Sequence, residues 1–323
     1  MRFDSRGLVS TYLSQWMPTG DTTRQAVAGY FAGGNGGSNT SRVDTLIFSS
    51  ETITNLGNIL LAAYGNLAAH ANSGVAGYVT GFYDSSVGDF VSTGNKIAFP
   101  SNTTSVIAGM NPITAYGRAG FANSGVAGYV GGGQAGGTRD VINKLLYSAD
   151  TTTTLSATLT TGIYYGGAFS NSGVAGYFTD GFDGTTSRVD KITFSADTKS
   201  VISATLTSGI VYTSGMSDYG VGGYVVGGTP DGGSTKLSRI DKITFPADTK
   251  TTLSATLTTA RWQTGNSSNT GVAGYMGGGS DSGGFIDGID KITFPTDTKS
   301  TLSAVLSYAR TGATGAFSDC GVL

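Results

Sequence analysis

Cysteine and histidine are almost missing from this sequence of 323 residues, which contains one of each, Cys320 and His70. One cysteine excludes an intrachain disulfide framework, and the two residues cannot supply a zinc site of the usual Cys and His ligands. His70 lies in LAAHANSG without a nucleophile motif beside it, so a structural role is expected rather than a place in a catalytic triad. We expect no metal site, no cofactor and no enzymatic activity.

Charged residues are also scarce, at 12% of the chain, with a net charge of -2. This composition provides no basic surface for nucleic acid and no polybasic patch for a membrane. No apolar run approaches the roughly 18–20 residues that span a bilayer, and the first twenty residues lack the apolar stretch of a secretory signal. We therefore expect neither nucleic-acid binding nor membrane insertion.

Glycine, in contrast, is abundant, with 52 residues against 6 prolines, and much of it belongs to an internal repeat. Six segments share one motif: AVAGYFAGG, GVAGYVTGF, GVAGYVGGG, GVAGYFTDG, GVGGYVVGG and GVAGYMGGG. Their tyrosines are Tyr30, Tyr78, Tyr129, Tyr177, Tyr224 and Tyr275. A repeat of about fifty residues is typical of propellers and other repeat architectures.

Each unit contains further strand-like segments after this motif, such as RVDKITF and then TTLSATL or SVISATL. These segments are β-branched, aromatic or alternating, and clusters of Gly, Asn, Asp and Ser separate them. A fourth strand is expected in the short stretch before each GVAGY. Six units of four antiparallel strands predict an all-β chain that folds as a six-bladed β-propeller around a central channel.

The order of residues within a unit resembles the kelch repeat. In the sixth unit the matching residues are Arg261, Gly265, Gly271, Tyr275, Gly278, Gly279, Phe294 and the strand around Leu302. The sequence departs from the kelch pattern where Leu253 or Leu302 replaces the usual tryptophan, and where the diglycine is altered in YVTGF and YFTDG. The Ser-, Thr- and Gly-rich style further resembles kelch-like proteins of tailed bacteriophages, especially cyanophages, which implies a virion protein associated with a tail or fibre.

The repeat begins near residues 26, 74, 125, 173, 220 and 271, which makes residues 26–323 the propeller. The tail RTGATGAFSDCG matches the segment that precedes each GVAGY, so residues 311–320 are predicted to supply the innermost strand of the first blade and to close the ring. Residues 1–25 align with the same segment and are one copy too many. They are interpreted as an arm whose apolar residues dock on a neighbouring subunit or a virion component; these residues are Leu8, Tyr12, Leu13 and Trp16. In the alternative, the N-terminal copy closes the ring.

Polar residues recur once per unit in the third strand, and a structural role between blades is favoured over a ligand site. The acids and amides are Asp44, Asn95, Asn143, Asp190, Asp241 and Asp290, and a lysine follows in five units: Lys96, Lys144, Lys191, Lys242 and Lys291. The turn residues Asp150, Asp197, Asp248 and Asp297 are interpreted as Asx-turns.

An aromatic residue recurs where one unit connects to the next, and kelch propellers commonly bind partners on the face that contains this connection. The residues are Tyr64, Tyr116, Tyr164 or Tyr165, Tyr212, Trp262 and Tyr308. They suit stacking on sugar rings or contact with a protein, and the alternative is that they fill gaps between blades. Variable loops between the second and third strands share this face, and the second loop adds Phe82, Tyr83 and Phe90, expected to be exposed.

These observations favour a non-enzymatic binding or structural protein of a phage virion, located in the tail or fibre. Its partners would be other virion proteins or a host-surface glycan or receptor, and it would form a homo-oligomer within the particle. The alternatives are an intracellular, cytoplasmic kelch-type interaction scaffold and, with less weight, a glycan-active enzyme.

Overall fold

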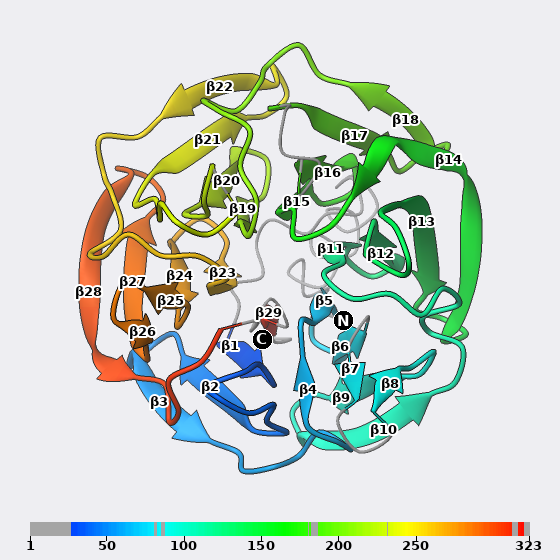
Figure 1. Cartoon of the computed structure of the whole chain (residues 1–323), viewed down its shortest axis with the longest axis horizontal. Coiled ribbons are helices and arrows are strands. Elements are labelled where there is room, and N and C mark those ends of the chain that lie inside the picture. The colour runs from blue at the N-terminus through cyan, green and yellow to red at the C-terminus, as the bar shows by residue number, and fades with distance from the viewer. Residues whose placement is uncertain are drawn as a thin grey trace, which may run out of the picture.

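A computed structural model of the chain describes residues 27–80, 83–84, 88–179, 181, 187–230, 232–311 and 316–319. Within these residues the secondary structure consists of β-strands and contains no helix, which confirms the all-β class. The strands form six four-stranded antiparallel sheets, as the repeat predicts. The sheets surround a common centre (Figure 1), an arrangement compatible with a β-propeller.

We number the sheets along the chain and name their strands from the centre outward. Sheet 1 contains β29 (Ala316–Asp319), β1 (Ala28–Ala32), β2 (Val43–Ile47) and β3 (Thr52–Asn55). Sheet 2 contains β5 (Ala68–Asn72), β6 (Ala76–Thr80), β9 (Gly94–Ala98) and β10 (Thr103–Ile107). Sheet 3 contains β11 (Ala119–Asn123), β12 (Ala127–Gly131), β13 (Arg139–Leu146) and β14 (Thr151–Ile163).

The other three sheets repeat this order. Sheet 4 contains β15 (Ala168–Asn171), β16 (Ala175–Thr179), β17 (Val189–Thr193) and β18 (Thr198–Val201). Sheet 5 contains β19 (Ser214–Asp218), β20 (Gly222–Val226), β21 (Ile240–Thr244) and β22 (Thr249–Thr252). Sheet 6 contains β23 (Gly265–Asn269), β24 (Ala273–Gly277), β27 (Gly288–Thr293) and β28 (Thr298–Val305). Short strands in the loops form two small sheets, one of β4 (Tyr64–Gly65), β7 (Tyr83–Asp84) and β8 (Asp89–Phe90), the other of β25 (Ser280–Asp281) and β26 (Gly284–Phe285).

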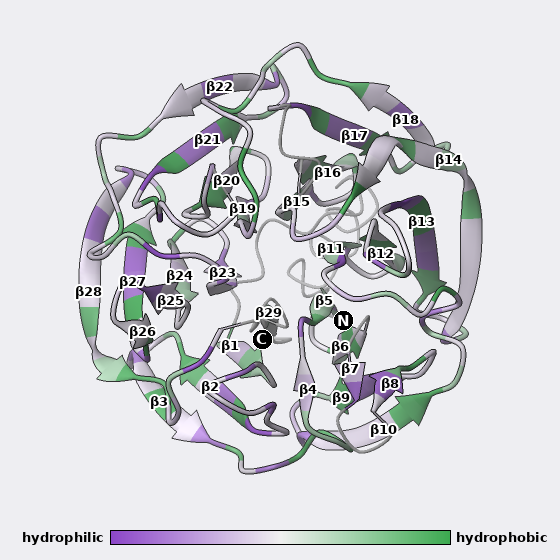
Figure 2. Ribbon diagram, viewed as in Figure 1, coloured by the Kyte–Doolittle hydropathy of each residue, from purple (hydrophilic) through white to green (hydrophobic). Residues whose placement is uncertain are grey.

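Burial decreases from the centre of each sheet to its outer edge. Every residue of the second strands β1, β6, β12, β16, β20 and β24 is buried. The third strands alternate between hydrophobic and hydrophilic residues (Figure 2, along β17 and β21), whereas the outer strands β18 and β22 are mostly exposed. A sheet that is apolar on both faces near the centre must pack between two neighbours.

Hydrophobic clusters lie between all neighbouring sheets, including between sheet 6 and sheet 1, where Phe31 and Leu46 meet Tyr275 and Ile289. The innermost strands also contact one another in the cyclic order β5, β11, β15, β19, β23, β29 and back to β5. Contacts between the sheets thus continue around the full circle.

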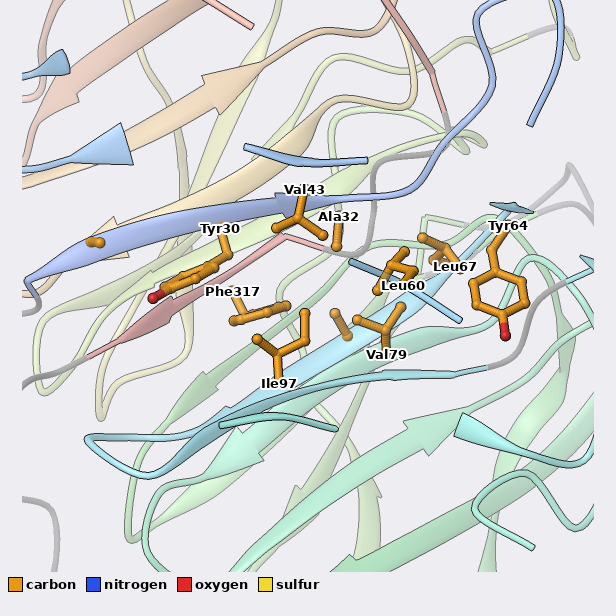
Figure 3. Close-up of a cluster of buried hydrophobic side chains, with 11 residues drawn as sticks. Tyr30, Ala32, Val43, Leu60, Tyr64, Leu67, Val79, Ile97 and Phe317 are labelled. Carbon is orange, nitrogen blue, oxygen red and sulfur yellow. The ribbon is translucent and has the colours of Figure 1, made fainter. Parts of the chain in front are cut away.

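The innermost strand of sheet 1 comes from the C-terminal segment. β29 pairs with β1 in antiparallel register, with Phe317 opposite Tyr30. The two rings stack with centroids 5.1 Å apart, and Phe317 is buried between Tyr30 and Ile97 (Figure 3). The predicted arm, residues 1–25 with Leu8, Tyr12, Leu13 and Trp16, lies outside the described residues.

The glycine of each AGY or GGY segment faces a side chain from the innermost strand of the preceding sheet. The pairs are Gly29 with Ser267, Gly77 with Phe317, Gly128 with His70, Gly176 with Phe121, Gly223 with Phe169, and Gly274 with Met216. A Cβ atom on any of these glycines would overlap the partner side chain. Glycine is required at these positions because a neighbour's side chain occupies the space of the missing Cβ.

Candidate functional site

The connections between sheets are fixed to the ends of the second strands by backbone hydrogen bonds. Tyr116 and Gln134 exchange N–H···O bonds of 2.9 and 3.2 Å, and Trp262 and Ser280 exchange bonds of 3.1 and 3.2 Å. Tyr116 and Trp262 are therefore held at the edge of their own sheet.

The second glycine of the diglycine that precedes this contact donates a hydrogen bond to the connection that leads to the following sheet. The N–H of Gly133 donates to Ile163 O at 2.7 Å, and the N–H of Gly279 donates to Arg310 O at 2.8 Å. A Cβ on Gly279 would lie 2.7 Å from Trp262 O, and its φ of 106° is unfavourable for other residues. These glycines thus allow three backbone segments to meet behind the aromatic side chains.

Seven aromatic side chains form a continuous series over sheets 2 to 6, which we call the aromatic arc. Its members are Tyr83, Phe90, Tyr116, Tyr164, Tyr165, Tyr212 and Trp262. Neighbouring ring centroids lie between 4.5 Å, for Tyr165 and Tyr212, and 6.1 Å, for Tyr116 and Tyr164. All seven side chains are half-buried, so each leaves part of its ring at the surface.

The structure joins most, but not all, of the aromatic residues that the sequence singles out. Tyr64 is only 4% exposed, and its hydroxyl accepts a hydrogen bond from Asn95, because β4 pairs with β7 above it. Tyr308 lies apart from the arc and donates a 2.6 Å hydrogen bond to Gly36 O. Tyr83 and Phe90 are half-buried rather than exposed, because Phe90 stacks on Tyr116 at 4.8 Å; Phe82 lies outside the described residues.

Two residues of this surface were not selected as site residues from the sequence, or only as an alternative. Tyr165, given only as an alternative to Tyr164, is the ring that links Tyr116 to Tyr212. Lys236 was not singled out, yet its Nζ lies 5.1 Å from the centroid of the Trp262 ring. The doubled tyrosine in GIYYGG was the available signal for Tyr165, whereas nothing in the sequence distinguished Lys236.

The recurrent polar residues of the third strands hold neighbouring sheets together. Asp190 accepts bonds from Thr160 N and Oγ1, and Asp290 accepts the equivalent pair from Thr258, between 2.6 and 2.9 Å. Asp44 forms a fully buried ion pair with Arg310 at 3.0 Å. These contacts agree with the structural interpretation of this series.

The lysines and the turn acids form a second series between sheets. In sheet 3, Tyr129 Oη donates to Asp197 of sheet 4 at 2.7 Å, and Lys144 Nζ pairs with the same carboxylate at 2.7 Å. The arrangement recurs with Asp150, Asp248, Asp297 and Glu51 as acceptors. These carboxylates accept hydrogen bonds from the preceding sheet, a role that the Asx-turn interpretation missed.

His70 is a buried packing residue of β5. It occupies the position at which β11, β15 and β29 have phenylalanine, and its ring stacks on Tyr78 with centroids 5.2 Å apart. Its Nδ1 lies 3.0 Å from the hydroxyl of Tyr147, and its buried Nε2 has no hydrogen-bond partner in the part of the chain that the structure describes. Burial lowers the pKa of His70 to about 3. Cys320 lies outside the described residues.

We expect His70 to make the protein sensitive to mild acid. Its pKa in the folded state is below the ordinary 6.5 of the unfolded chain, so lowering the pH from 6.5 toward 3 protonates the unfolded state first and reduces stability. Replacing His70 and Tyr147 together by phenylalanine, the pair found between other sheets, removes this effect. Between pH 7 and pH 5 the double variant should lose about 2 kcal/mol less unfolding free energy than the wild type in urea titrations. If the wild type and the double variant lose the same unfolding free energy between pH 7 and pH 5, His70 is not the cause of the acid sensitivity.

The centre of the ring offers little room for a ligand. Among the described residues, two hollows along it measure about 90 and 50 Å³ and are lined mainly by Ala, Gly, Ser and Phe of the innermost strands. Within the described ranges, no group of three or more His, Cys, Asp or Glu residues could hold a metal ion. Larger surface hollows of about 400 and 550 Å³ lie beside Tyr308 and beside Lys236, and their linings are mostly polar and contain no group of aromatic rings. The aromatic arc is therefore the best candidate for a site.

No helix in the described part of the chain is long and apolar enough to cross a membrane.

No protein-family model and no curated protein matches the chain.

Proposed function

We propose that this chain is a non-enzymatic binding protein, a six-bladed kelch-like β-propeller that is closed by its C-terminal strand and binds a surface glycan through the aromatic arc. The observation behind the proposal is the arc itself, seven half-exposed rings in unbroken contact along one end of the sheets. Rigid aromatic side chains beside polar groups are a common composition of binding surfaces. The diglycine hydrogen bonds support the backbone beneath the rings, so little ordering would be needed on binding.

Alanine variants of the arc test this proposal. Tyr116→Ala, Tyr164→Ala and Trp262→Ala are each expected to weaken binding to a glycan array by at least about tenfold, because each removes one contact ring. Tyr308→Ala is the matched control, since Tyr308 is half-buried at an equivalent connection but lies outside the arc. Unchanged binding in the three arc variants would overturn the proposal. A wild-type protein that binds no glycan but retains a protein partner through the arc would favour an interaction scaffold.

We further propose that the protein is a component of a phage virion, associated with the tail or fibre and assembled there as a homo-oligomer. The support for this is the resemblance of the repeat to kelch-like phage proteins. Mass spectrometry of purified particles tests it, and absence of the chain from particles that contain the other structural proteins would contradict it.

A further inference from the structure

Two tyrosines of the arc adopt a backbone conformation that bulky residues normally avoid. Tyr165 has φ of 58° and Tyr212 has φ of 57°, both in the left-handed region. They occupy the same position in consecutive connections, and the corresponding residues of three other connections are Asn66, Gly117 and Gln263. Glycine and asparagine tolerate this region well, whereas tyrosine is strained in it. Strain of this kind often accompanies a functional site.

The strained residues belong to a compact group of four, which we call the tyrosine cluster: Tyr116, Tyr164, Tyr165 and Tyr212. Tyr165 contacts the other three, with ring centroids at 5.9 Å from Tyr116, 5.0 Å from Tyr164 and 4.5 Å from Tyr212. The planes are tilted by 37° to 61° in these contacts, so the rings form a faceted surface rather than a stack.

The hydroxyl groups of three members of this cluster, Tyr116, Tyr165 and Tyr212, are available to a ligand. The side-chain oxygens of Tyr116, Tyr165 and Tyr212 make no hydrogen bond within the described part of the chain. The tyrosines of the second strands behave differently, since Tyr129 and Tyr177 each donate a 2.7 Å hydrogen bond to a carboxylate of the next sheet. These three residues of the cluster thus combine apolar ring faces with uncommitted donors and acceptors.

The four side chains of the cluster are themselves uncharged at neutral pH, and no charged group among the described residues shifts the pKa of Tyr164, Tyr165 or Tyr212. Burial raises the pKa values of Tyr164, Tyr165 and Tyr212, and the remaining causes are other tyrosines of the cluster rather than any acid or base. Two cations lie at the border of this region: Lys236 over Trp262, and Arg139 opposite Ile163, the residue before Tyr164. A charged ligand group placed against the four rings themselves would lose hydration without gaining an ionic partner from them.

We propose that the tyrosine cluster is the anchor of the binding face and that its ligand is an uncharged saccharide. This inference rests on the function proposed above and specifies its ligand class. The apolar face of a neutral sugar ring fits against the tyrosine rings, and its hydroxyl groups can exchange hydrogen bonds with the phenol oxygens. Tyrosine suits such contact because it is large, amphipathic and loses little conformational entropy on binding.

The strain itself provides a specific test. Tyr165→Gly and Tyr212→Gly each remove a contact ring but relieve the unfavourable φ, so binding and stability should separate. We expect the affinity for neutral oligosaccharides to fall at least about tenfold in each variant. The melting temperature should stay within about 3 °C of wild type, because strain relief offsets lost packing. Gln263→Gly is the matched control, at the same backbone position but outside the cluster, and should bind as wild type does.

The probe is an array of neutral oligosaccharides beside uronic-acid and sulfated ones, with affinities measured by calorimetry for members that bind. Binding of acidic members only, or full affinity in both glycine variants, would overturn the neutral-saccharide anchor while leaving the proposed binding function intact. If wild-type protein binds no member of the array, the proposed glycan-binding function fails as well.

Discussion

A chain that ends at Thr311 is expected to lose cooperative folding. It lacks β29, so β1 keeps an unpaired edge and loses four backbone pairings, Ala28–Asp319 to Phe31–Ala316. It also lacks Phe317, which is 4% exposed and fills the space beside Gly77. Phe317→Ala alone should cost about 3–5 kcal/mol of unfolding free energy, the usual range for a buried phenylalanine. The full truncation removes more and should leave little of a total stability of about 5–15 kcal/mol.

Chemical denaturation followed by circular dichroism measures this effect, and a chain that starts at Ala26 is the comparison. Because the strand paired with β1 is β29, the N-terminal deletion should keep the unfolding midpoint of the full chain. The reverse outcome, in which the N-terminal deletion unfolds and the C-terminal truncation does not, would show that residues 1–25 close the ring.

Gly176→Ala is expected to destabilise the protein by at least about 3 kcal/mol, although it adds a single methyl group. The new Cβ would overlap the ring of Phe121, which is itself buried between sheets 3 and 4. Phe121 cannot move aside easily, because it stacks on Tyr129 and contacts Phe178, with centroids at 5.4 and 4.6 Å.

The overlap also predicts how this substitution combines with a second one. Phe121→Ala destabilises by leaving a cavity, and the methyl group of Gly176→Ala partly fills that cavity, so the double variant should be more stable than the sum of the single effects implies. Gly137→Ala is the matched control, since a Cβ at Gly137 meets no atom within 4 Å and its φ is not in the left-handed region. Additive effects, or a mild loss in Gly176→Ala, would contradict the proposed overlap.

The sequence was sufficient to predict most of the local structure of each unit. The repeated motif identified the second strand, and RVDKITF identified the third. The fourth strand was located only in part, because β18 and β22 end at Val201 and Thr252, near the start of the predicted SVISATL and TTLSATL segments. The short strand before each GVAGY was also predicted, from the need for a fourth strand in each unit. Such features depend on residues close together in the chain, where periodicity is informative.

Features that depend on two units at once were predicted less well. The burial of Tyr64 follows from the pairing of β4 with β7, and the role of Asp197 follows from its distance to Tyr129 of the preceding sheet. The aromatic arc requires both the connections and the position of Phe90 in a long loop. These contacts join residues tens of positions apart, and a repeat shows that such contacts recur without showing which atoms meet.

The pairing of β1 with β29 gives the molecule a polarity. Ala28 lies opposite Asp319, so the first and last described strands begin and end at the same side of the ring. The diglycines and the aromatic arc follow the other end of the second strands, as Gly133 and Gln134 do after β12. Anything joined to the protein through either end of the described chain would therefore be tethered on one side, and the aromatic surface would point away from the tether.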